Sequence, residues 1–132
     1  MNKFLLLVED STFDVELVLH AAERCGMHER IVVRRDGQEA LDYLMACAAD
    51  GGLPALVLLD LHMPGRDGFE VLKTLRATPA LSDIAVVMMS SSMMEADRRR
   101  AALLGVREYF VKTGDMDVLT GFLRRLSREY LS

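Results

Sequence analysis

Residues 55–68 read Ala-Leu-Val-Leu-Leu-Asp-Leu-His-Met-Pro-Gly-Arg-Asp-Gly, and this stretch decides the fold. The unbroken apolar run over residues 55–59 has the length of a strand buried on both faces, as in a parallel sheet covered by helices. Residues 63–65, which include Pro64, predict the loop that follows. Asp60 therefore ends a buried strand, at the edge where open α/β sheets bind ligands. Asp60 is a candidate for chemistry, and the simpler alternative is a carboxylate that only caps the turn.

Composition limits the classes of protein that the chain can represent. Its 132 residues are 51% hydrophobic, which is the length of a single domain and enough apolar material for an ordinary core. The net charge of −4 argues against a nucleic-acid-binding domain, because such domains are normally basic. We expect one domain spanning residues 1–132, with no nucleic-acid partner.

No segment of the sequence predicts export or membrane insertion. The apolar residues 4–8 are too few for a signal peptide and are followed by Glu9 and Asp10 instead of a small-residue cleavage site. No apolar run has the length of a membrane span. Cys25 and Cys47 lack the spacing of metal ligands, so we expect two reduced cysteines in a cytoplasmic protein.

Strand and helix patterns alternate along the whole chain. Continuous apolar runs predict five strands, at residues 4–8, 31–33, 55–59, 84–89 and 108–111, and a helical pattern follows each. Ser11, with Asp14 three residues on, is expected to cap the first helix through a capping box. Ser92 and Glu95 are expected to do the same for the fourth helix.

The alternation predicts an α/β fold, a doubly wound parallel sheet with helices on both faces and right-handed crossovers. With five strands, the flavodoxin-like order 2-1-3-4-5 is expected, and it places the first and third strands side by side. Glu9 and Asp10 then leave the sheet next to Asp60, so three carboxylates crowd one pocket. Ser90 ends the fourth strand and Lys112 follows the fifth, at the same edge of the sheet.

The residue types in this pocket favour phosphoryl transfer. Neighbouring carboxylates repel one another, and a hard divalent cation removes the conflict without protonating any of them. Mg²⁺ suits the cleft because it prefers oxygen ligands and commonly binds one or two carboxylates together with phosphate oxygens. Asp60 supplies an oxygen nucleophile, Ser90 a hydroxyl group and Lys112 a cation.

Over nearly its whole length the sequence resembles the receiver domain of two-component response regulators. The motifs that carry the resemblance are Val8-Glu9-Asp10, residues 60–68, Ser90 and Tyr109-Phe110-Val111-Lys112. The resemblance implies a receiver fold and a signalling module rather than an enzyme.

The resemblance also implies a phosphoacceptor and a metal site. Asp60 would accept a phosphoryl group from a histidine of a sensor kinase or of a phosphotransfer protein. Asp10, Asp60 and the backbone carbonyl of His62 would hold Mg²⁺, and Glu9 would help through a water molecule.

Three further residues would read the phosphoryl group. By the same resemblance, Lys112 would pair with the phosphoryl oxygens and Ser90 would hydrogen-bond to one of them. Tyr109 would move between exposed and buried positions as Ser90 moves, which makes it part of a two-state switch. An ordinary half-buried strand residue is the alternative interpretation of Tyr109.

The sequence departs from the family pattern at three places. Thr113 follows Lys112 where the family usually has a proline after a cis peptide, and we expect a trans bond here because a non-proline cis bond is costly. Ser90 stands in place of the commoner threonine. His62 and Ser92 occupy positions that tune hydrolysis of the aspartyl phosphate in this family.

A finer resemblance concerns partners. Residues 35–44 and 81–89 look like those of small single-domain regulators that pair with phytochrome-type kinases. Kinase contact is expected around Phe13, Asp14 and Leu17. The face of the last two helices and the fifth strand would be the output or homodimer surface. Because nothing follows Ser132, a stand-alone module is expected.

Three other functions remain as alternatives. The first is a receiver-like binding module that works without phosphorylation, which Thr113 keeps open. The second is an aspartate-nucleophile phosphatase of the haloacid dehalogenase type, but His62 stands where that chemistry needs a second aspartate. The third is a flavodoxin-type flavin binder, whose phosphate would meet Glu9 and Asp10 in the first loop.

Overall fold

The computed structural model describes residues 3–63 and 65–132, so Pro64 in the predicted loop and the first two residues of the chain lie outside it. The strands form a five-stranded parallel sheet in the predicted order β2-β1-β3-β4-β5. Their bounds are β1 Leu5–Val8, β2 Ile31–Arg34, β3 Leu56–Asp60, β4 Val86–Ser90 and β5 Glu108–Val111. The fourth strand begins later than predicted, because Ile84 lies in the turn before it.

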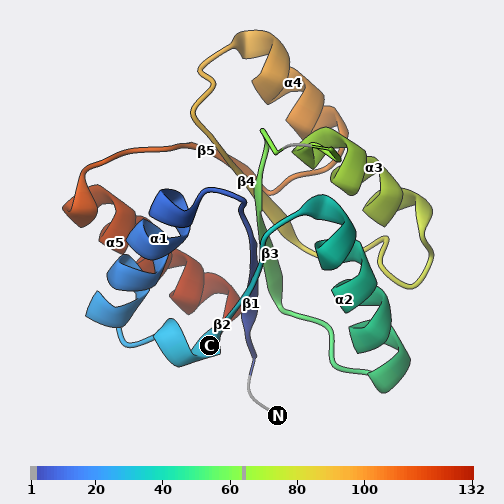
Figure 1. Ribbon diagram of the computed structural model, residues 1–132, viewed down its shortest axis with the longest axis horizontal. Helices are drawn as coiled ribbons and strands as arrows, with labels where there is room; N and C mark the ends of the chain where they lie inside the picture. Colours follow the sequence, from blue (N-terminus) through green and yellow to red (C-terminus); the bar gives the residue numbers. More distant parts are fainter. Residues whose placement is uncertain (1–2, 64) are drawn as a thin grey trace.

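Helices cover both faces of the sheet (Figure 1). On one face lie α1 (Thr12–Arg24) and α5 (Met116–Tyr130), and a short 3₁₀ helix, η1 (His28–Arg30), precedes β2. On the other face lie α2 (Gly37–Asp50), α3 (Gly68–Ala77) and α4 (Glu95–Leu103). The loops after the strands all lie at one edge of the sheet, opposite the edge where β1 begins.

Continuous apolar sequence gives each central strand two buried faces. Leu6 and Leu59 point into the core shared with α2, α3 and α4, whereas Leu7 and Leu58 point into the core shared with α1 and α5. All residues of β1, β3 and β4 are buried. This burial explains why these strands lack the alternation of apolar and polar residues that half-exposed strands show.

Side-chain caps begin four of the helices. Ser11, Asp36, Asp67 and Asp115 accept hydrogen bonds from backbone N–H groups in the first turns of α1, α2, α3 and α5. The predicted capping box at Ser92 is wrong, because the residue that precedes α4 is Met94, whose side chain makes no capping bond. Gly105 follows the C-cap of α4 with φ +79°, the left-handed conformation that glycine commonly adopts after a helix.

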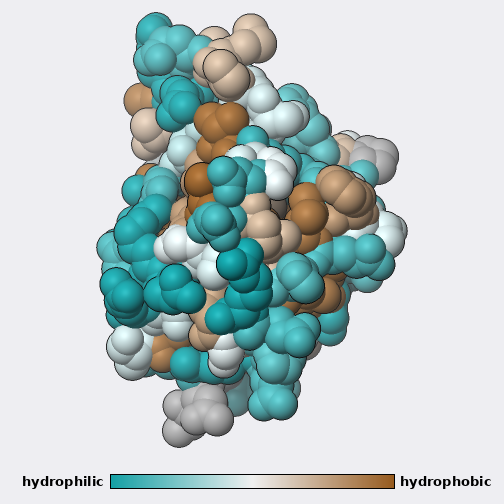
Figure 2. Space-filling view, turned by 90° about the vertical axis from the view of Figure 1, so that its left-hand side faces the viewer, coloured by the Kyte–Doolittle hydropathy of each residue, from teal (hydrophilic) through white to brown (hydrophobic). Residues whose placement is uncertain are grey.

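The face formed by α1 and α5 is covered mainly by hydrophilic side chains, with hydrophobic ones in smaller patches (Figure 2). Within the described residues, no helix combines the length and the hydropathy needed to cross a membrane.

Candidate functional site

The candidate site lies where four strands end. In the parallel register Val8 is opposite Leu59, so Glu9 and Asp10 leave β1 beside Asp60 at the end of β3. Ser90 ends β4 opposite Val111, and Lys112 follows it. The topology thus brings together residues that lie about 100 positions apart in the sequence, as the predicted strand order requires.

Glu9, Asp10 and Asp60 form an acidic cluster. One carboxylate oxygen from each residue lies within 4.8 Å of those of the other two. Glu9 and Asp60 are buried and Asp10 is partly exposed. Oxygen ligands in this arrangement are those that a hard divalent cation such as Mg²⁺ prefers.

Lys112 places its ammonium group among three carboxylates. Its Nζ lies 2.8 Å from Oε1 of Glu9, 2.8 Å from Oδ2 of Asp14 and 3.1 Å from Oδ1 of Asp60. Of these contacts, the one to Asp14 has the geometry of a hydrogen bond, with the ammonium donating. The backbone N–H of Lys112 donates to the carbonyl of Ser90, which fixes the start of its loop.

Burial dominates the electrostatics of the pocket. Burial raises the pKa of Glu9 to about 7, against the lowering effect of Lys112. The pKa of Asp60 is also raised by burial, although Lys112 opposes the shift. Burial lowers the pKa of Lys112, but Asp14, Glu9 and Asp60 outweigh it and the pKa is raised overall. One ammonium group therefore does not neutralise the acidic cluster.

A buried acceptor in the cluster lacks a hydrogen-bond donor. Oε1 of Glu9 receives no hydrogen bond, although Nζ of Lys112 is close to it, while Oε2 accepts a bond from the N–H of Ser11 at 3.2 Å. Since the one ammonium group of Lys112 lies beside a cluster of three carboxylates, excess negative charge remains around this buried Oε1, which fits a site for a cation.

The start of α3 packs directly against the backbone of Asp60. A Cβ atom on Gly68 would lie 2.5 Å from the carbonyl oxygen of Asp60 and 2.8 Å from Cα of Leu61. The N–H of Gly68 donates to the carbonyl of Leu61 at 2.8 Å. Glycine at this position therefore lets α3 fix the end of β3.

Ser90, Ser92 and Tyr109 form a hydrogen-bonded chain next to Asp60. Oγ of Ser90, which is buried, accepts from the N–H of Ser92 at 3.0 Å. The hydroxyl of Tyr109 donates to the carbonyl of Ser92 at 2.9 Å. Oγ of Ser92 hydrogen-bonds to Oδ2 of Asp97 at 2.5 Å, and the guanidinium of Arg98 lies over the Tyr109 ring. The half-buried ring is thus tied to the first turn of α4.

The structure also describes His62, the Lys112–Thr113 peptide and the two cysteines. The side chain of His62 is exposed, and its imidazole does not belong to the acidic cluster in the described part of the chain. No cis peptide occurs among the described residues, so the Lys112–Thr113 bond is trans as expected. Cys25 and Cys47 are free thiols.

The contacts of two residues near the site were not predicted. Arg35 donates from Nη2 to the backbone carbonyl of Asp10 at 2.8 Å and to Oγ1 of Thr12 at 2.7 Å, which fixes the loop between β1 and α1. Asp14 was expected to cap α1 and to lie near a partner kinase. Its N–H does donate to Oγ of Ser11, but its carboxylate binds Lys112 instead of completing a capping box.

Known proteins resemble the chain in both sequence and structure. The probable methanogenesis regulatory protein FilR2 of Methanothrix harundinacea is 42% identical over 109 residues, which are 82% of this chain and 70% of that protein. The phosphorylated cyanobacterial phytochrome response regulator RcpA superposes with a TM-score of 0.87 at 34% identity, covering 100% of this chain and 96% of that one.

The Mn²⁺-bound form of Rcp1, a response regulator of Synechocystis, superposes with a TM-score of 0.82 at 31% identity, covering 98% of this chain and 95% of the other. The family model of the response regulator receiver domain matches residues 5–124. Since this match spans most of the sequence, the chain belongs to the response regulator receiver domain family.

Proposed function

We propose that this chain is a stand-alone response regulator, a single receiver domain over residues 1–132, and that Asp60 is its phosphoacceptor. Phosphorylation by a kinase is the general function of the family to which the chain belongs. The observation that carries the proposal is the position of the Asp60 carboxylate, which is buried at a strand end 3.1 Å from Lys112 and inside the acidic cluster.

The residues of the pocket divide the work of phosphoryl transfer. A carboxylate oxygen of Asp60 attacks the phosphorus atom of a phosphohistidine, the new O–P bond forms as the N–P bond breaks, and the imidazole leaves with the electron pair. Lys112 pairs with the phosphoryl oxygens and the hydroxyl of Ser90 donates to one of them. Catalysis of this kind depends on positioning and on neutralising negative charge.

Mg²⁺ is the cofactor that fits this pocket. Asp10, Asp60 and the backbone carbonyl of His62 would hold it, and Glu9 would bind it through water. The closeness of the three carboxylates and the burial of two of them support the assignment. Bound Mg²⁺ would supply positive charge that binds phosphate oxygens and removes the repulsion between the carboxylates. The similar Rcp1 has a Mn²⁺-bound form.

We further propose that the signal leaves through the face formed by α4, β5 and α5. When Ser90 turns its hydroxyl toward the phosphoryl group, it releases the N–H of Ser92, which it holds in the described conformation. Ser92 carries the bond from Tyr109 and the bond to Asp97, so its movement changes both β5 and α4. A homodimer through this face, or an unidentified downstream protein, would detect the change.

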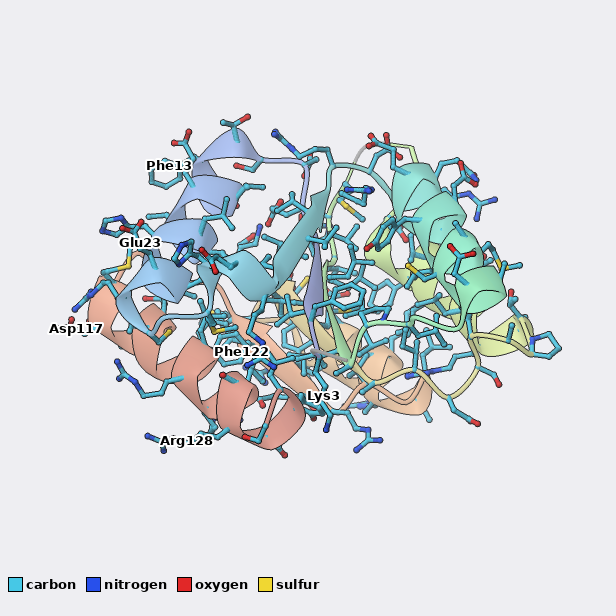
Figure 3. The ribbon with its side chains drawn as sticks, turned by 90° about the horizontal axis from the view of Figure 1, so that it is seen from below. Lys3, Phe13, Glu23, Asp117, Phe122 and Arg128 are labelled. Atoms are coloured by element: carbon cyan, nitrogen blue, oxygen red, sulfur yellow. The ribbon has the colours of Figure 1, made fainter. Side chains whose placement is uncertain are left out.

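The upstream partner proposed here is a phytochrome-type histidine kinase or a phosphotransfer protein. Similarity to RcpA, a phytochrome response regulator, supports this partner. Phe13, on the first turn of α1, points away from the protein with 69% of its surface exposed and is available for contact (Figure 3). With such a kinase as its partner, the protein would act in the cytoplasm.

Intact mass after incubation with acetyl phosphate and Mg²⁺ tests the proposal. We expect one added phosphoryl group on the wild type and none on Asp60→Asn or in the presence of a chelator. Continuous release of phosphate without a limit on turnover would instead indicate an aspartate-nucleophile phosphatase. A folded, Mg²⁺-binding protein that forms no adduct with acetyl phosphate or with a phosphorylated kinase would indicate the phosphorylation-independent module.

A further inference from the structure

Lys112 has a carboxylate partner that does not belong to the acidic cluster. Among the described residues, the carboxylates within 4.0 Å of its ammonium group are those of Glu9, Asp14 and Asp60. Glu9 and Asp60 are also members of the acidic cluster, and Asp14 is not. Asp14 comes from α1, whereas the phosphoacceptor Asp60 ends β3.

Asp14 is held in place by local structure. Its N–H donates to Oγ of Ser11 at 3.2 Å, which caps α1, and the next residue, Val15, is buried in the core with α5. The N–H of Ser11 is satisfied by Glu9 and so does not compete for the Asp14 carboxylate. The Asp14 side chain is 27% exposed, so its carboxylate contacts Lys112 from the rim of the pocket.

Lys112, by contrast, depends on its partners for the position of its charge. Lysine carries its ammonium group on a flexible four-carbon stem with three donor hydrogens. The two residues that follow are Thr113 and Gly114, and Gly114 is exposed, with no neighbouring atom within 4 Å of where a Cβ would lie. The backbone of Lys112 is tied to the sheet through its N–H, which donates to the carbonyl of Ser90.

We propose that Asp14 is a positioning residue that holds the Lys112 ammonium group beside Asp60 for phosphoryl transfer, an inference that rests on the function proposed above. When a cation engages Glu9 and Asp60, their hold on the ammonium group weakens. The hydrogen bond from Lys112 to Asp14 remains, since Asp14 lies outside the cluster. This bond uses one of the three N–H donors of the ammonium group. The other two donors are left for the phosphoryl oxygens, and the hydrogen bond to Asp14 limits where the ammonium group can go.

The rate of phosphorylation by acetyl phosphate at saturating Mg²⁺ tests this role, because this small donor needs no kinase contact. Asp14→Asn should slow the reaction about tenfold, because it removes the negative charge that attracts the ammonium group and leaves only a neutral amide acceptor. Asp14→Glu, which keeps a carboxylate able to reach the ammonium group, should restore most of the rate. Glu16→Gln is the matched control: Glu16 is exposed on the same helix and is not among the described partners of Lys112. Its rate should equal that of the wild type.

A double-mutant cycle separates positioning from a purely structural effect. In the Lys112→Ala background, Asp14→Asn should cause no further loss of rate, because Asp14 acts through the ammonium group. A full additional tenfold loss in that background would overturn the inference, as would a wild-type rate for Asp14→Asn. Thermal unfolding of each variant shows that the proteins compared are folded.

The experiment also separates this inference from the function on which it rests. If the wild type forms the adduct and Asp14→Asn forms it equally fast, only the role of Asp14 is wrong. If the wild type forms no adduct with acetyl phosphate or with a phosphorylated kinase, the proposed function fails and the role of Asp14 fails with it.

Discussion

At the scale of a single residue, burial of Glu9 makes the ionised form of its carboxyl group unfavourable in the folded protein. Its side chain is fully buried and its pKa is raised by burial to about 7, from an ordinary value of 4.5. The folded protein therefore keeps a proton on Glu9 at pH values where the unfolded chain has lost it. Stability attributable to Glu9 is greatest below pH 4.5 and decreases as pH rises through about 7.

Glu9→Gln should remove this pH dependence. Without added metal, the variant and the wild type should be similar in stability near pH 5, where Glu9 is mostly protonated. At pH 8 the variant should be the more stable, by on the order of 2 to 3 kcal/mol, because it has no buried charge. Urea unfolding with a chelator at both pH values measures the difference. A gap between the two proteins that stays the same at both would contradict the raised pKa.

Bound Mg²⁺ should relieve the repulsion among the carboxylates of Glu9, Asp10 and Asp60. We expect it to raise the melting temperature of the wild type, and to raise it more at pH 8 than at pH 5, because protonated carboxylates bind cations weakly. A concentration 100 times the dissociation constant stabilises the folded state by about 2.7 kcal/mol. Asp10→Asn should lose most of the increase, and chelation should abolish it in the wild type. An equal increase in the melting temperatures of the wild type and of Asp10→Asn would indicate that the ion binds elsewhere.

At the scale of the secondary-structure elements, the contact between α3 and β3 fixes the phosphoacceptor strand. The N-cap Asp67 accepts from the N–H of Glu70, and Gly68 then packs on the carbonyl of Asp60. The helix can begin this close to the sheet only because Gly68 has no side chain.

Gly68→Ala should therefore destabilise the protein, by about 1–3 kcal/mol as for other overpacked positions. The added Cβ meets backbone atoms of Asp60 and Leu61, which cannot rotate away. Gly121→Ala is the matched control, because Gly121 lies inside α5 with no atom within 4 Å of its Cβ position. That substitution should stabilise the helix by about 0.5–1 kcal/mol. Urea unfolding compares the two, and an equal effect would contradict the steric argument.

Tyr109 connects β5 to the segment that precedes α4. Tyr109→Ala removes the hydroxyl that donates to Ser92 and the ring that Arg98 covers. Phosphorylation of the variant should proceed at the wild-type rate, because the Tyr109 side chain contacts Ser92 and Arg98 rather than the acidic cluster. The phosphorylation-induced change at the α4–β5–α5 face should be weakened, and sedimentation of phosphorylated proteins measures it through dimer formation. Equal dimer formation by both proteins would count against the switch.

Most helices and strands could be predicted from the sequence. The contacts of side chains that had two competing partners could not. Continuous apolar runs and the strand order sufficed to bring Glu9, Asp10 and Asp60 together. Asp14 satisfied a local capping pattern, yet its carboxylate binds Lys112, 98 residues away. Ser92 likewise fitted a capping box, but it bonds to Asp97 instead and α4 begins after Met94. Hydrophobic periodicity predicts which face of a helix or strand is buried. It does not predict which of two possible partners a polar side chain binds when one of them is far away in the sequence.

At the scale of the whole molecule, α1 and α5 form a support for the phosphoacceptor edge. Phe122 of α5 lies between that helix and the sheet (Figure 3), where it stacks on Phe110 of β5 with ring centroids 3.8 Å apart. Arg24 of α1 and Asp117 of α5 form an ion pair at 2.9 Å. Since Asp14 and Phe13 also lie on α1, this support carries both the partner of the Lys112 ammonium group and the exposed Phe13.

Locating the phosphoryl group in the chain tests most directly whether Asp60 is the phosphoacceptor. Protein treated with acetyl phosphate and Mg²⁺ is reduced with borohydride, which converts an aspartyl phosphate to homoserine and releases phosphate, and is then digested and sequenced by mass spectrometry. We expect homoserine at position 60 and at no other aspartate. Homoserine at Asp10 or at another aspartate, with Asp60 unmodified, would contradict it.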